Sequence, residues 1–166
     1  MRWFVRLSMG MGPPGFSPQT ELMKLDGYGA VKLWAELDGG YLFHPNIGVG
    51  AWSAISRWSS SPDGAPALGE TAYFIGGELP LRFGSRTAAV VLAPRLGFCS
   101  GSMDLGGSVP SQHALAFGGE LGVISFKYHL SASVGYLRAS VPPPGELGRD
   151  HDLGGLQVLV GGTIDG

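Results

Sequence analysis

Apolar and polar residues alternate along most of this chain with a period of two. From Tyr73 to Phe83 the odd positions are apolar or glycine, whereas the even positions include Glu78 and Arg82. Successive side chains of a β-strand point to opposite faces, so this segment predicts a strand with one apolar and one polar face. In strand after strand the polar face also carries Gly, Trp and Ala, which are typical of buried positions. A polar interior and an apolar exterior are the arrangement of a β-barrel in lipid.

The alternation predicts eight strands. They are Arg2–Gly12, Gly27–Leu42, Ile47–Trp58, Thr71–Phe83, Thr87–Cys99, His113–Ser125, His129–Ser140 and Asp152–Ile164. Tight turns at 43–46, 84–86 and 126–128 alternate with longer connections at 13–26, 59–70, 100–112 and 141–150, which are rich in Pro, Gly and Ser. Short turns at one end and long loops at the other are the layout of bacterial outer-membrane barrels. Both termini are then expected on the short-turn, periplasmic side.

The predicted outer face carries almost no charge. Its two charged residues, Arg57 and Arg138, fall at loop ends, whereas a charge at the bilayer midplane would cost ~2–4 kcal/mol. Aromatic residues gather near the strand ends and predict girdles at the two membrane interfaces. The predicted girdle comprises Trp3, Tyr41, Phe43, Phe83, Phe126 and Tyr128 near the tight turns, and Trp58, Tyr73, Phe98 and Tyr136 near the long loops.

The predicted inner face collects four cations and four anions. They are Arg6, Lys32, Glu36, Asp38, Glu78, Arg82, Arg95 and Glu120. We expect these opposite charges to pair there in one network, through charge-assisted hydrogen bonds. Eight strands enclose a lumen that side chains can just fill, and Trp34, Trp52 and Phe74 also point inward. The sequence therefore predicts a plugged lumen in place of an open pore.

Composition agrees with a single membrane barrel. The chain has 166 residues, enough for one domain over 1–166, and only 14% are charged, against ~25% in typical soluble domains. No apolar run approaches the ~20 residues of a membrane-spanning helix. The net charge of −2 gives no reason to expect nucleic acid as a partner.

Cysteine usage and the first residues set further expectations. Cys99 is alone, so no disulfide framework exists, and no His/Cys cluster suggests a metal or cofactor. The start Met1–Arg6 does not make a signal peptide, because its apolar stretch is short and Arg6 interrupts it. An outer-membrane protein needs such a signal. We therefore expect a mature or trimmed segment, or a misplaced start.

Three segments resemble a known family. They are Phe4–Gly10, Leu37–Gly50 and Gly76–Phe83, the last leading toward Pro94–Gly97. The chain resembles the small eight-stranded outer-membrane β-barrels of the OmpA-like transmembrane-domain type. This resemblance implies a monomer in the outer membrane of a Gram-negative bacterium. Its partners would be the lipid bilayer and, through the external loops, lipopolysaccharide or surface ligands. Many such barrels end in an aromatic residue, whereas this chain ends in Thr163–Gly166.

The function that follows is a structural or surface-interaction scaffold without enzymatic activity. One alternative is a soluble lipocalin-like barrel holding a small apolar ligand, but the charges on the inner face argue against it. The other alternative is a narrow pore, or an enzyme whose site lies at the rim of the barrel. Candidates for rim chemistry are Ser111, His113, Ser140 and Asp150–Asp152. His151 and Asp152 are adjacent and point to opposite faces of a strand, so they cannot form a dyad directly.

Overall fold

The structure, a computed structural model, describes residues 2–13, 31–61, 63, 68–85, 87–105, 111–142 and 151–166, apart from the side chains of 105 and 151. The strands are β1 (Arg2–Gly12), β2 (Lys32–His44), β3 (Ile47–Ser60), β4 (Leu68–Glu78), β5 (Leu81–Gly84), β6 (Ala88–Leu105), β7 (Gln112–Ser125), β8 (Leu130–Arg138), β9 (Ser140–Val141), β10 (His151–Asp152) and β11 (Gly155–Asp165). Within those ranges no helix is long and apolar enough to cross a membrane.

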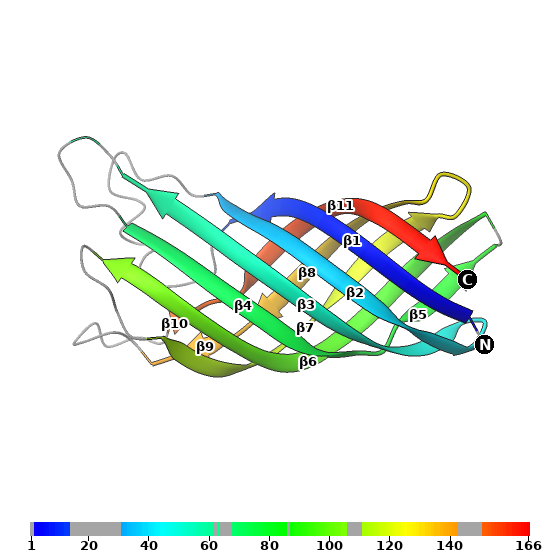
Figure 1. Ribbon diagram of the computed structural model, residues 1–166, viewed down its shortest axis with the longest axis horizontal. Coiled ribbons are helices and arrows are strands. Elements are labelled where there is room, and N and C mark those ends of the chain that lie inside the picture. The colour runs from blue at the N-terminus through cyan, green and yellow to red at the C-terminus, as the bar shows by residue number, and fades with distance from the viewer. Residues whose placement is uncertain are drawn as a thin grey trace.

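The long strands close into an antiparallel barrel. Closure occurs where β1 pairs with both β2 and β11, so that Met9 lies opposite Ala35 on one side and Val160 on the other. β4 and β5 follow each other along one position of the barrel, between β3 and β6, and this gives eight positions around the ring. Both termini lie at the same end (Figure 1). The predicted all-β, eight-stranded antiparallel barrel is confirmed.

Burial follows the predicted alternation. Along β1, Phe4, Arg6 and Ser8 are buried while their neighbours are exposed. The outer surface is covered with large apolar side chains, including Leu7, Leu37, Ile75, Leu96, Phe98, Leu121 and Val160, all of them at least half exposed. Charged side chains such as Arg6 are enclosed. The molecule is therefore polar inside and apolar outside.

The predicted strand Thr71–Phe83 is interrupted. It consists of β4 and β5, separated by Leu79 and Pro80. Proline has no N–H to donate to a neighbouring strand, which breaks the regular ladder at this point. The gap is still held on both sides, because Leu79 N donates to Pro94 O at 3.1 Å and Gly48 N donates to Pro80 O at 3.0 Å.

The last two predicted strands are also shorter than expected. β8 ends at Arg138 where Ser140 was expected, and β11 begins at Gly155 where Asp152 was expected. Between them, β9 and β10 form a separate two-stranded ladder. The carboxylate of Asp152 accepts hydrogen bonds from the Ala139 N–H at 2.8 Å and the Gly154 N–H at 2.9 Å, which accounts for the two breaks.

Other strand ends differ by a few residues. β2 continues to His44 and β6 to Leu105, because each finds partners beyond the predicted end. β3 and β4 likewise pair out to Ser60 and Leu68. The first predicted residues of the second strand, 27–30, lie outside the described residues.

The interior matches large residues to small ones at one level of the barrel. Trp52 on β3 lies opposite Gly76 on β4, which lies opposite Gly97 on β6, and Ala116 on β7 follows. A Cβ atom on Gly76 would lie 2.2 Å from the carbonyl oxygen of Leu96, so no larger residue fits. This row leaves room in the lumen for the indole of Trp52, which is 1% exposed.

Candidate functional site

Six charged side chains meet in the middle of the described lumen, and we call them the central cluster. They are Arg6 of β1, Glu36 and Asp38 of β2, Glu78 of β4, Arg95 of β6 and Glu120 of β7. Each is buried. Alternation turns these side chains inward, and the strand register brings them to a common level, with Arg6 opposite Asp38 and Glu78 opposite Arg95.

Arg95 contacts all four carboxylates of the central cluster. Its Nη1 and Nη2 each donate to one oxygen of Glu36 at 2.8 Å, and its Nε donates to Glu78 at 3.1 Å. The same Nη2 lies 2.5 Å from Asp38 Oδ1 and 2.7 Å from Glu120 Oε2. Bidentate guanidinium–carboxylate pairs are among the strong hydrogen bonds of proteins. Arg95 therefore ties β6 to β2, β4 and β7 through side chains.

Arg6 makes the second set of contacts. Its Nε donates to Asp38 Oδ2 at 2.9 Å, and its Nη2 donates to Glu120 Oε2 at 2.7 Å. Nη1 donates to the other oxygen of Glu120, which makes this pair bidentate as well. Asp38 and Glu120 thus bridge the two arginines across the lumen.

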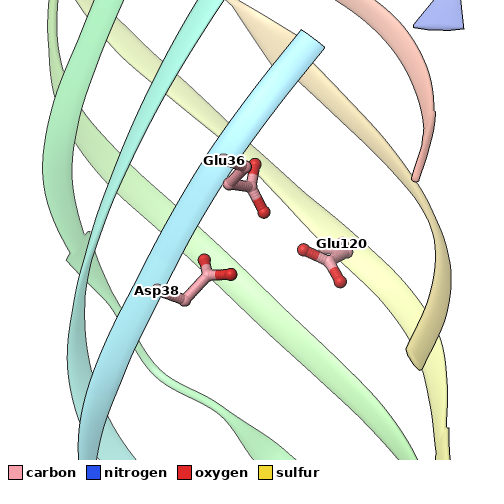
Figure 2. Close-up of side chains that lie close together, drawn as sticks. All are labelled: Glu36, Asp38 and Glu120. Atoms are coloured by element: carbon pink, nitrogen blue, oxygen red, sulfur yellow. The ribbon is translucent and has the colours of Figure 1, made fainter. Parts of the chain in front are cut away.

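The three carboxylates that face one another resemble a metal site at first sight. Glu36, Asp38 and Glu120 bring carboxylate oxygens within 4.8 Å of one another, and Figure 2 shows them converging from β2 and β7. The guanidinium groups of Arg6 and Arg95, however, already lie against all three. A metal ion there would meet two cations at contact distance. The arrangement fits a charged plug and does not fit a metal centre.

Lys32 lies apart from the central cluster. Its Nζ pairs with Glu70 of β4 and donates to the carbonyl oxygens of Leu153 at 2.5 Å and Gly154 at 3.1 Å. Glu70 was not among the predicted inner charges, since the predicted strand began at Thr71. Continuing the even parity of Phe74 and Glu78 to position 70 would have identified it.

Arg82 is also separate, which corrects the expectation of one charge network. Its nearest acidic partner is Asp165 of β11, with Nη1 3.4 Å from both carboxylate oxygens. Its guanidinium lies over the rings of Phe4, at 4.7 Å, and Phe126, at 5.7 Å. Asp165 was missed because the last strand was predicted to end at Ile164, although odd positions of that strand face inward.

Aromatic side chains fill the lumen next to the central cluster. The ring centroids of Trp34 and Phe74 are 5.5 Å apart, and those of Trp52 and Phe74 are 6.2 Å apart. The guanidinium of Arg95 lies 5.2 Å from the Trp52 ring centroid. These rings are at most 2% exposed. The side chains therefore occupy the middle of the barrel.

Most of the aromatic residues assigned to girdles lie on the outer surface. The exposed ones are Trp3, Tyr41, Phe43, Phe83, Tyr128, Tyr73, Phe98 and Tyr136. Trp58 contradicts the assignment, because its even position on β3 turns it inward and leaves it 2% exposed. Phe126 is partly buried against Val91 and Ile124 and over Arg82, so it lies at the lumen end and does not point outward.

The residues considered for rim chemistry do not assemble a dyad in the described part of the chain. Asp152 is engaged by two backbone N–H groups, as described above. His113 lies opposite Ser100 on an exposed strand end. Asp150 and the side chain of His151 lie outside the described residues. Cys99 is buried in the lumen wall.

Comparisons with known proteins identify the fold. No family model matches the sequence, and no curated protein is similar to it in sequence. Among solved structures, Neisserial surface protein A (NspA) has a TM-score of 0.63 and 16% identity, over 98% of this chain and 96% of that one. Ail, the attachment invasion locus protein of Yersinia pestis, has a TM-score of 0.55 and 13% identity over the same shares. Ail in a phospholipid bilayer nanodisc has a TM-score of 0.56 and 14% identity, over 97% and 99%.

Proposed function

We propose that this chain, which folds as a small barrel of the outer-membrane type, spans the outer membrane of a Gram-negative bacterium. In this proposal residues 1–166 are one domain and act as a monomeric, non-enzymatic scaffold. Its closed interior holds the barrel rigid, and its external loops interact with partners at the cell surface. The tight turns and both termini face the periplasm.

The observation that carries the proposal is the inverted distribution of polarity. Large apolar side chains cover the outer surface, while the central cluster is buried inside. A soluble lipocalin-like barrel would need the opposite arrangement, with an apolar interior for its ligand. In lipid the outer surface needs no further cover, and the closed barrel leaves no unpaired strand edge.

The charge of the long connections indicates which class of surface partner fits this chain. Ail has been solved in complex with the heparin analogue sucrose octasulfate, a polyanion. The predicted long connections of this chain contain two basic residues, Lys24 and Arg149. Leaving aside Glu70 and Asp104, which lie on β4 and β6, they contain five acidic ones, Glu21, Asp26, Asp63, Glu146 and Asp150. Such loops repel polyanions, including phosphorylated lipopolysaccharide without bridging cations, and favour a basic or neutral partner.

Folding into detergent tests the membrane assignment. The purified chain is expected to need detergent or lipid, to show β-structure there, and to migrate differently on a gel before and after heating. A folded, monodisperse protein in plain buffer would contradict the proposal and favour the soluble barrel.

Binding to charged probes tests the surface role. The barrel in neutral-lipid nanodiscs is expected to bind a fluorescent hexalysine peptide and to ignore sucrose octasulfate at about 0.15 M salt, where the Debye length is ~8 Å. Replacing these five acidic loop residues with their amides should abolish peptide binding and leave the barrel folded. Tight binding of sucrose octasulfate by the unmodified chain would contradict the assignment of a basic or neutral partner.

A further inference from the structure

The end of the barrel opposite the long loops contains a cavity of about 850 Å³. Its walls come from the tight turn after β2, from the connection after β5 and from both terminal strands. Apolar lining is supplied by Leu42, Ala89 and Phe126, and charged lining by Arg2, Arg82 and Asp165. The cavity therefore offers an apolar wall beside a cationic group.

The guanidinium of Arg82 is fixed in this cavity but incompletely satisfied. The residue is 6% exposed, and its backbone N–H donates to Asn46 O at 2.8 Å, which fixes the start of its side chain. The rings of Phe4 and Phe126 hold the guanidinium. Its contacts to Asp165 are long, at 3.4 Å, and its Nε has no hydrogen-bond partner among the described residues. A buried donor without a partner costs stability until an acceptor reaches it.

Nothing in the central cluster can satisfy Arg82. Val91, which lies directly opposite Arg82, and Ile124 form an apolar layer with Ala93 on that side of the lumen. Arg82 lines the cavity, so a ligand there can reach its guanidinium from the open end. Arg2 and Arg82 against Asp165 leave the cavity with one excess positive charge, which a monoanion would neutralise.

We propose that this cavity is a binding site for a carboxylate attached to an apolar group. The carboxylate pairs with the Arg82 guanidinium where it lines the cavity, in the bidentate geometry that guanidinium groups favour, and replaces its long contacts to Asp165. The apolar group packs against Leu42, Ala89 and Phe126. The site faces away from the surface loops, so it is a second binding function beyond the proposed surface role.

Hippurate, a water-soluble aromatic carboxylate, is a suitable probe. The full chain in neutral-lipid nanodiscs is expected to bind hippurate in an NMR or calorimetric titration. The neutral analogue hippuramide and the dianion phenyl phosphate should bind at least about tenfold more weakly. Arg82→Gln should weaken hippurate binding by about tenfold or more, as expected for loss of a charged hydrogen-bond donor. Arg138→Gln, an exposed arginine on β8, is the matched control and should leave binding unchanged.

Asp165→Asn separates ligand binding from a purely structural role of Arg82. Removing the competing carboxylate frees Arg82 and raises the excess charge, so hippurate should bind several-fold more tightly. If Arg82→Gln does not show the heat-dependent gel mobility of the folded barrel, Asp165→Asn still tests the proposal. Hippuramide binding as tightly as hippurate, or Asp165→Asn leaving hippurate binding unchanged or weaker, would overturn the proposal.

Discussion

Arg95 and Arg82 are the same residue type on the same inner face, yet their surroundings differ. Arg95 is enclosed by four carboxylates, whereas Arg82 has one distant carboxylate and two aromatic rings. Removing either side chain therefore has different consequences. For Arg95 the consequence is four acidic groups left with one arginine inside a space of low dielectric constant.

The central cluster contains two guanidiniums and four carboxylates, so losing a cation should cost far more than neutralising an acid. Arg95→Met is expected to lower the free energy of unfolding by about 3–5 kcal/mol, the usual penalty for an uncompensated buried charge. Glu78→Gln is expected to change it by less than about 1 kcal/mol, because Glu78 contacts one arginine and an amide oxygen can accept the same hydrogen bond. Urea titration of the barrel in lipid vesicles measures both. A larger loss for Glu78→Gln would contradict the charge count.

A double-mutant cycle tests whether the inner charges form separate groups. Arg95→Met combined with Glu36→Gln should be non-additive by about 0.5–3 kcal/mol, because the two side chains share two hydrogen bonds. Arg95→Met combined with Arg82→Gln should be additive within about 0.5 kcal/mol, because an apolar layer lies between them. Coupling of equal size in both cycles would mean that the lumen charges act as one network.

At the scale of the strand, the sequence predicted the face of most side chains, with Trp58 and Phe126 as exceptions, but not where ladders break. Period-two alternation depends on local backbone geometry, so parity could be read directly, as for Glu78 and Phe74. The break at Pro80 follows from its missing N–H and could have been read from the sequence. The break at Ala139 depends on a distant partner, the Asp152 carboxylate. Period-two alternation also identified most of the inner charges as one set. Their division into separate groups depends on the register between strands, which alternation does not give. Glu70 and Asp165 were missed because predicted strand ends carry errors of a few residues.

Two positions on the outer face of β6, expected at different depths in the bilayer, test where the membrane lies along the barrel. Leu96 and Val90 both lie on the outer face of β6, but Leu96 is near the middle of the strand and Val90 is close to its start. Leu96→Arg is expected to cost about 2–4 kcal/mol in vesicles, whereas Val90→Arg should cost about 0–1 kcal/mol because its guanidinium can reach the interface. The readout is the free energy of unfolding in urea. Equal penalties at both positions would contradict a bilayer centred on the middle of β6.

At the scale of the whole molecule, the barrel wall and its contents have different roles. The wall is an antiparallel ladder that closes on itself through β1, and its outer surface is suited to lipid. The contents join opposite sides of the wall, since Arg95 reaches from β6 to β2 and Arg6 from β1 to β7. Side-chain pairing across the lumen should therefore stiffen the wall that carries the loops.

The side chains that fill the lumen also determine whether ions can pass through the barrel. The central cluster and the rings of Trp34, Trp52 and Phe74 occupy the described middle of the lumen, and a guanidinium in contact with carboxylates in low dielectric moves away only at high cost. Planar-bilayer recordings of the wild-type chain are therefore expected to show no steady conductance. The pair Glu36→Ala with Arg95→Ala removes both ends of the bidentate contact and should open small, brief channels, whereas Arg138→Gln on the outer face should remain silent. Steady, ion-selective wild-type conductance would mean that the lumen side chains leave a continuous water path, and the chain would then be a pore.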